Sequence, residues 1–271
     1  MALAVTHVES GRTWRHNEHL RLPSASLIKL PILAAFWETV EAGRLDPGER
    51  VSVPAEALRV EGKGGAEGAR AWAAADVERS GGADDHGSDN VVTNLIIDRL
   101  GMEAIQGWID KAGLGETRIE RRMDRSAMSA GRGNWTSAAD METLLLAIAA
   151  GTCVSGEASR ELGRALEAQQ IQDRLARRLG DGVHVANKTG NFADVIHDAG
   201  IMTWPSGTLV IAVLTQGVRP PWQVIDVVAE IAGTSSADVC QVVLNHAGGG
   251  HPAAFFMGTD ARRSVPPRHA C

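Results

Sequence analysis

The sequence predicts an α/β (α+β) fold in which one sheet is assembled from both ends of the chain, with a helical part inserted between them. Two patterns lead to this prediction. Residues 4–8 and the segments between residues 183 and 215 have the composition and period of strands. The middle of the chain instead repeats its apolar residues at helical spacing. With 271 residues, 44% of them hydrophobic, the chain is long enough for one large domain or two small ones.

The N-terminal residues predict a hairpin and then a helix. Glu9-Ser10-Gly11 has turn chemistry, with extended structure on both sides of it. From Leu27, apolar residues recur at helical spacing until Gly43, a residue type that suits the end of a helix. We expect a local kink at Pro31, because proline removes one backbone hydrogen bond from a helix interior.

The rest of the chain predicts further helices, one long loop and three strands. Residues 113–135 are Gly-rich, Arg-rich and aperiodic, and loops of that length in compact domains are usually functional or disordered. Before this loop we expect a helix over residues 89–100, with Ser88 as its N-cap, and a second helix that carries Ile105, Trp108 and Ile109. After the loop we expect helices over residues 137–150 and from Ser155 to about Leu179. Strands are expected at residues 183–189, 199–204 and 208–215, followed by a helix over 222–231.

Composition excludes several function classes. The 33 acidic and 27 basic residues give a net charge of −6, which argues against nucleic acid as a partner. Three widely spaced cysteines and scattered histidines indicate no disulfide framework, no metal site and no cofactor. The chain has no apolar run of 18 residues and no secretory signal pattern. As written we expect no membrane segment and a cytoplasmic location, or a secreted or periplasmic one if a signal was removed.

Three short motifs carry the chemistry: Ser26-Leu27-Ile28-Lys29, Ser88-Asp89-Asn90 and Lys188-Thr189-Gly190. Their joint chance in a chain of this composition is about one in ten thousand, although the first alone would be weak evidence. Ser26 lies at the start of a predicted buried helix, where free N–H groups stabilise an oxyanion. Lys29, three residues later, lies on the same face of this helix as Ser26. The apolar residues around Lys29 favour its neutral amine, which can accept the serine proton.

The other two motifs supply groups that bind a substrate or move a proton. Gly190 lets a ligand approach the backbone at the end of a strand, Lys188 supplies positive charge, and Thr189 offers a hydroxyl to a carboxylate. Ser88 can relay a proton between the lysines and a leaving nitrogen, and Asn90 can bind a substrate amide. Read alone, each motif also fits a helix cap or an ordinary strand end.

With these motifs in this order, the chain resembles a class A β-lactamase, or more broadly the serine β-lactamase and penicillin-binding transpeptidase-like superfamily, from about Val5 to Gly233. The resemblance implies that Ser26 is the acylated nucleophile, Lys29 a general base and Ser88 the proton relay. It also implies an oxyanion hole made by the backbone N–H groups of Ser26 and Asn191, and substrate contacts from Asn90, Asp124, Lys188, Thr189, Gly190 and Asn191.

The same resemblance implies an antiparallel sheet flanked by helices, plus an inserted all-helical subdomain. We place the sheet part at residues 1–23 and 183–245 and the helical part at 24–182, with 113–135 as the active-site loop. Residues 246–271 are expected to form a disordered tail. The expected partner is a small-molecule substrate, and we expect a monomer.

Class A enzymes hold their deacylating water with a glutamate followed by leucine and asparagine. By resemblance Glu120 fits the glutamate, while Met123 and Asp124 replace the other two residues. A second carboxylate could weaken Glu120 as a base; alternatively, both acids are solvated loop residues. The strand after the third motif also lacks the arginine that often binds the substrate carboxylate, and Arg219 is a weak substitute.

Residues 61–90 depart from the family, because they contain no Leu, Ile, Met or Phe and 14 of the 30 are Ala or Gly. Such a segment buries little surface and should be loose. One hypothesis is a reading-frame disturbance, which would also account for residues 246–271 and which the coding DNA would test. The alternative is a diverged mobile loop with a disordered tail.

Three functions are compatible with the sequence. The first is a serine hydrolase that opens β-lactam rings through an acyl-enzyme on Ser26, with deacylation assisted by Glu120. The second is a D,D-peptidase, amidase or esterase on the same fold. The third is an inactive, destabilised homologue, which residues 61–90 make plausible.

Overall fold

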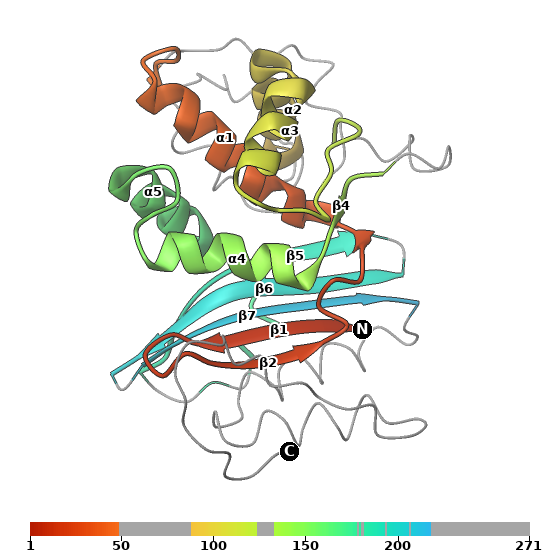
Figure 1. Cartoon of the computed structure of the whole chain (residues 1–271), viewed down its shortest axis with the longest axis vertical. Coiled ribbons are helices and arrows are strands. Elements are labelled where there is room, and N and C mark those ends of the chain that lie inside the picture. Colours follow the sequence, from red (N-terminus) through yellow and green to blue (C-terminus); the bar gives the residue numbers. More distant parts are fainter. Residues whose placement is uncertain are drawn as a thin grey trace, which may run out of the picture.

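The computed structural model describes residues 1–48, 88–123, 133–177, 179, 182–192, 194–205 and 207–217. Five antiparallel strands form its main sheet, in the order β2-β1-β7-β6-β5 (Figure 1). The N-terminal hairpin supplies β1 (Ala2–His7) and β2 (Arg12–His16). The last third supplies β5 (His184–Phe192), β6 (Val195–Trp204) and β7 (Gly207–Gln216). Because β1 pairs with β7, the two ends of the described chain meet in one sheet, which confirms the expected fold.

Helices cover one face of this sheet (Figure 1). α4 (Ala138–Ala149) packs on β1, β6 and β7, and α5 (Gly156–Glu167) packs on β5. A second helical group, α1 (Lys29–Glu41), α2 (Ser88–Leu100) and α3 (Met102–Lys111), packs together next to them. The core between helices and sheet includes the fully buried Phe36, Ile109, Met141, Leu145 and Leu162.

Buried apolar side chains lie on both faces of the sheet. Ala4 and Ala212 face the helical core, whereas Val5 and Ile211 belong to a separate cluster with Trp14. Val5 lies opposite Ile211 across β1 and β7. The alternation of strand side chains therefore divides the core into two parts.

Three expectations about individual elements were wrong, and β6 also begins at Val195, four residues before the expected residue 199. α5 ends at Glu167 rather than near Leu179, because Arg174 and Leu175 form hydrogen bonds to β5 and β6 that a continuing helix would not allow. β5 does not close at the third motif but continues to Phe192, paired with β6 throughout.

The third concerns Pro31. The α-helix begins at Lys29 after a 3₁₀ turn, so this proline lies in the first turn, where a backbone N–H has no partner within the helix. The expected loss of a hydrogen bond therefore does not arise. Gly43, at φ +66°, adopts the left-handed conformation that follows a helix end.

Several expectations fall on residues outside the described ranges: the loose segment 61–87, Asp124, Arg219, the helix over 222–231 and the tail 246–271. α2 begins at Ser88, the residue expected to cap it. In the described part of the chain, no helix is long and apolar enough to cross a membrane.

Candidate active site

Ser26 lies on a short 3₁₀ turn, η1 (Ala25–Ile28), that connects the small sheet to α1. This small sheet pairs β3 (Leu22–Pro23) with β4 (Trp135–Thr136) and is extended by a hydrogen bond from the Ser24 N–H to the Asn134 carbonyl, 2.8 Å long. Ala25 has φ +46°, an unfavourable conformation for a residue with a Cβ. The backbone before Ser26 is therefore strained at Ala25 and held against β4 by the hydrogen bonds of residues 22–24.

Ser26 is half-buried and Lys29 is buried, with 9% of its surface exposed. Lys29 follows Ser26 by three residues, and positions three apart align along a 3₁₀ turn. This spacing is compatible with the shared face that the sequence predicts for the two side chains. Burial of the lysine in the apolar run is also confirmed.

The third motif lies directly against this turn. A Cβ built on Gly190 would be 3.3 Å from the Cβ of Ala25 and 3.3 Å from the Cβ of His197. Only a glycine allows β5 and η1 to approach this closely without displacing a neighbour. Beside it, Thr189 is buried and Lys188 is half-buried, with its Nζ donating to the Thr189 carbonyl at 3.3 Å. The structure thus brings the first and third motifs together.

His197 on β6, the residue paired with Gly190, holds β5 and η1 close together through two hydrogen bonds of its side chain. Its Nδ1 accepts a hydrogen bond from the Thr215 N–H at 3.0 Å, which leaves Nε2 to donate to the Pro23 carbonyl at 2.8 Å. Burial lowers the pKa of His197 to about 4. The imidazole is therefore neutral at pH 7 and joins the sheet to the residue three positions before Ser26.

Arg174 contacts Asn191, the residue directly after the third motif, from the segment that was expected to be helical. Its guanidinium donates to the His197 carbonyl and to the Asn191 side-chain oxygen, both at 2.6 Å. The adjacent Leu175 N–H donates to Asp198, whose other oxygen accepts from the Asn187 side chain at 2.8 Å. Burial raises the pKa of Asp198 to about 6. Sequence reasoning missed Arg174, because no local pattern connects residue 174 with β5.

Side-chain amides hold the loop that carries Glu120. The Asn134 oxygen accepts from the N–H groups of Glu120 and Arg121, at 2.9 and 3.1 Å, and its NH₂ donates to the Arg121 carbonyl. Asn94 on α2 exchanges two hydrogen bonds with the backbone of Met123. Because Asn94 and Asn134 are buried, this part of the loop has a defined shape on both sides of Glu120.

The Glu120 carboxylate itself is 40% exposed. It accepts from the Gly133 N–H at 3.2 Å and from the Trp135 indole N–H at 3.4 Å, and lies 3.8 Å from the Arg21 guanidinium. These contacts hold it beside β4, the strand paired with the segment that leads to Ser26. None of the three joins Glu120 to Ser26 directly.

The base of the loop is attached to α4 by Asp140. Its carboxylate accepts from the Thr117 hydroxyl at 2.6 Å and from the Glu116 N–H at 2.9 Å. Burial raises the pKa of Asp140 to about 6. Thr117 also shares a hydrogen bond with Thr136 on β4, so the loop is joined to both the helix and the small sheet.

The family model described as Beta-lactamase enzyme family matches residues 1–239. The chain belongs to this family. Among solved structures, it is 26% identical to a β-lactamase from Sphaerobacter thermophilus DSM 20745, with a TM-score of 0.71 over 93% of this chain and 92% of that one. It is 25% identical to PBP-A, with a TM-score of 0.70 over 90% and 88% of the two chains. An ancestral class A β-lactamase, 21% identical with a TM-score of 0.71 over 90% and 93%, shares the fold. No curated protein matches the chain.

Family and fold together support a serine hydrolase of the β-lactamase type. In this β-lactamase-family chain the second motif lies at the start of α2, which packs on α1. Asn90 is half-buried there, whereas the side chain of Ser88 lies outside the described part. Among the described residues, no group of three His, Cys, Asp or Glu side chains is arranged to hold a metal ion.

Proposed function

We propose that the protein opens β-lactam rings by forming an acyl-enzyme on Ser26. The observation that carries the proposal is the contact of η1 with β5, where Gly190 lies against Ala25. This contact supports a site in which the turn that carries Ser26 and the buried Lys29 lies against the edge strand β5. A strained residue immediately before the serine is consistent with a site held in a fixed geometry.

The acylation step follows from these groups. Lys29, as a neutral amine, accepts the proton of the Ser26 hydroxyl while its Oγ attacks the carbonyl carbon of the ring amide. The backbone N–H groups of Ser26 and Asn191 stabilise the oxyanion. When the C–N bond breaks, the proton held by Lys29 passes through the Ser88 hydroxyl to the nitrogen, which restores the neutral amine and the Ser88 hydroxyl. Substrate contacts come from Asn90, Asp124, Lys188, Thr189 and Gly190.

Deacylation is assigned to Glu120. A carboxylate acting as general base takes a proton from water, whose oxygen attacks the acyl carbon and releases Ser26 with its proton restored. Support comes from the backbone on both sides of Glu120, which Asn134 and Asn94 fix in place. The side chain must turn from its contacts with Trp135 and Arg21 toward the ester.

A second candidate, a D,D-peptidase-like enzyme with slow deacylation, is favoured by those same contacts of Glu120. The chain is also similar to PBP-A, and a single-residue mutant of PBP-A has been solved as an acyl-enzyme complex with penicillin G. The two candidates share acylation at Ser26 and differ only in the lifetime of the ester.

Intact-mass spectrometry with excess penicillin, together with a hydrolysis assay, separates these candidates. We expect a transient adduct with steady hydrolysis. A lasting adduct without hydrolysis would identify the peptidase-like enzyme. Ser26→Ala should abolish both signals, whereas Ser10→Ala, in the exposed β1–β2 turn, should leave them unchanged. Absence of adduct and of hydrolysis in the wild type would overturn the proposal and favour an inactive chain.

A further inference from the structure

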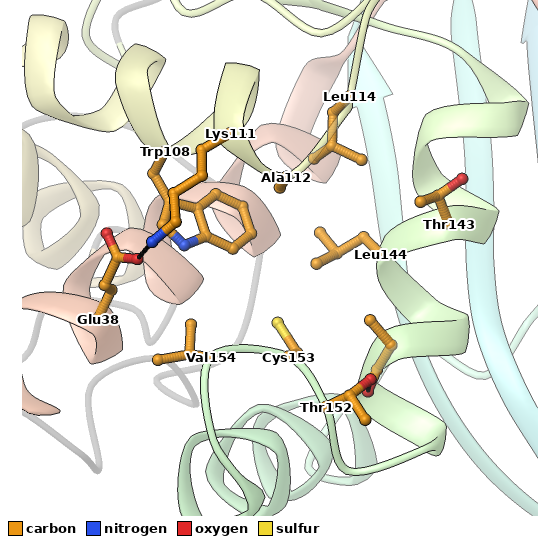
Figure 2. A pocket seen from close by; sticks show the side chains of 11 residues that line it. Glu38, Trp108, Lys111, Ala112, Leu114, Thr143, Leu144, Thr152, Cys153 and Val154 are labelled. Atoms are coloured by element: carbon orange, nitrogen blue, oxygen red, sulfur yellow. Dashed lines mark hydrogen bonds and ion pairs between the residues drawn. The ribbon is translucent and has the colours of Figure 1, made fainter.

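A cavity of about 340 Å³ lies away from Ser26, between the ends of α1 and α3, the outer part of α4 and the turn over residues 150–154 (Figure 2). None of the residues assigned to the acyl-enzyme reaction lines it. Its volume falls at the lower end of the range for small-molecule sites. The cavity is therefore large enough for a compact ligand and is separate from the candidate active site.

Apolar side chains surround the centre of this cavity, and polar ones from Glu38, Lys111, Thr143 and Thr152 complete its lining. Figure 2 shows Trp108, Leu114 and Leu144 around its centre, with Cys153 and Val154 opposite them. Trp108, Leu114, Leu144 and Cys153 are each less than 10% exposed, so these side chains are immobilised by packing on their other sides. A ligand here would gain contact with one indole and several aliphatic groups without reordering them.

Charge at the rim is balanced. The Lys111 Nζ lies 2.5 Å from Glu38 Oε1, and each charge neutralises the other. Because these two charges already neutralise each other and Lys111 is exposed, they give a charged ligand little electrostatic attraction. The lining therefore favours an uncharged ligand.

The wall formed by residues 150–154 is held in an unfavourable conformation. Val154 has φ +64°, although a β-branched residue is rarely found in the left-handed region. The backbone of its neighbour Cys153 is fixed by three hydrogen bonds. The Cys153 N–H donates to the Ser159 hydroxyl at 3.0 Å and to the Ala147 carbonyl, and the Ser159 hydroxyl donates to the Cys153 carbonyl at 3.1 Å. These bonds fix the backbone next to Val154 on this side of the cavity.

We propose that this cavity is a binding site for an uncharged, apolar compound with one or two rings. Indole is the probe, because it is a compact apolar molecule with two rings, and its single N–H can donate to the hydroxyl of Thr143 or Thr152 in the lining. The site does not depend on the acyl-enzyme reaction, and its test uses no β-lactam.

Alkylation of Cys153 reports on occupancy. Burial raises the pKa of this thiol to about 11, so iodoacetamide reacts slowly and must enter the cavity. Indole at about ten times its dissociation constant should slow this reaction about tenfold, as peptide mapping would show. Cys240 and Cys271, in the same chain, monitor the reagent. Equal slowing at all three cysteines, or none at Cys153, would overturn the proposal.

Two phenylalanine variants locate the ligand. Ala147→Phe places a ring in the cavity and should remove the protection by indole. Ala149→Phe, two residues along α4 on an exposed position, should keep it. Protection that survives in Ala147→Phe would place indole elsewhere and refute the site.

Amide exchange in the wild type gives an independent reading if Ala147→Phe does not fold. Leu114 lines the cavity, and its carbonyl accepts from the Thr117 N–H at 3.1 Å. Indole that packs against Leu114 should slow hydrogen exchange at Thr117 and Glu116. Unchanged exchange at both amides under saturating indole would contradict the proposal.

Discussion

His197 on β6 donates its Nε2 hydrogen to the carbonyl of Pro23 across 2.8 Å, and this bond joins two segments separated by 174 positions in the chain. Pro23 precedes the turn of Ser26 by two residues. His197 is also the residue opposite Gly190 in the β5–β6 pair. One buried imidazole therefore positions both the turn that carries the serine and the strand that lies against it.

Replacing His197 by phenylalanine should destabilise the protein by about 3 kcal/mol at pH 7. The ring fills the same space, but the Thr215 N–H and the Pro23 carbonyl lose their partner in a buried place. Urea unfolding measures the change. A loss below about 1 kcal/mol would mean that water or a backbone shift replaces both hydrogen bonds.

The same variant should alter the pH dependence of stability. The pKa of His197 is lowered to about 4 in the folded state, against 6.5 for an ordinary histidine. The unfolded chain therefore binds the proton more readily between these values, and stability is lost as pH falls from about 6.5 toward 4. His197→Phe removes this contribution, so the difference between wild type and variant should shrink on acidification. A constant difference over this window would contradict the assignment.

Asp198 should contribute with the opposite sign. Its folded-state pKa is raised to about 6, against an ordinary 3.8, so the folded protein holds the proton longer and loses stability as pH rises between these values. At pH 7 the carboxylate accepts from Leu175 and Asn187. Asp198→Asn removes the titration but turns an NH₂ toward one of these donors.

Unfolding free energies of Asp198→Asn at pH 4 and pH 7 test this prediction. The variant should have a lower free energy of unfolding than wild type at pH 4 as well as at pH 7, because its NH₂ faces one of the two donors and one hydrogen bond is lost at both pH values. Its own stability should fall less between pH 4 and pH 7. A steeper fall in the variant would show that Asp198 is not the group that titrates.

Asn134 offers a way to test the loop separately from the nucleophile. Asn134→Ala removes three hydrogen bonds to the backbone of Glu120 and Arg121, so the base loses its fixed position. We expect the acyl adduct to persist about tenfold longer, with acylation little changed. Time-resolved intact mass measures both rates. Asn134→Asp keeps the acceptor for the two N–H groups and should restore most of the hydrolysis.

The outcome for Asn134→Asp separates positioning from mere stability. If both variants slow acylation and hydrolysis alike, the side chain serves the fold as a whole. If only Asn134→Ala prolongs the adduct, the acceptor oxygen positions Glu120.

Local patterns predicted the elements and motifs well, whereas contacts between distant segments had no signal in the sequence. The hairpin, α3 and α4 follow from period, turn residues and caps within a few positions. Arg174 lies 17 residues before the Asn191 side chain that it contacts, and amphipathic spacing alone extended the helix through it. Tertiary hydrogen bonds overrode that pattern.

The site divides in the same way. The approach of β5 to η1 was expected only by resemblance, and the glycine that permits it was identified from the motif. The hydrogen bonds of Glu120 with Asn134 and Trp135 could not be predicted, because they join residues 14 and 15 positions apart and no local pattern indicates them. Uncharged amide anchors also leave no charge pattern in a sequence.

Gly190→Ala should slow acylation about tenfold with a modest loss of stability. The added methyl would lie 3.3 Å from Ala25 and from His197, both backed by packed structure, so β5 and η1 must separate by a few tenths of an ångström. Gly163→Ala is the matched control, because a methyl on that α5 residue meets nothing within 4 Å and should raise stability by about 0.5–1 kcal/mol. Acylation rates from stopped-flow or rapid-quench mass measurements decide the matter. Equal acylation in wild type and Gly190→Ala would show that the η1–β5 distance does not limit attack by Ser26, and the positioning role of the glycine would then be rejected.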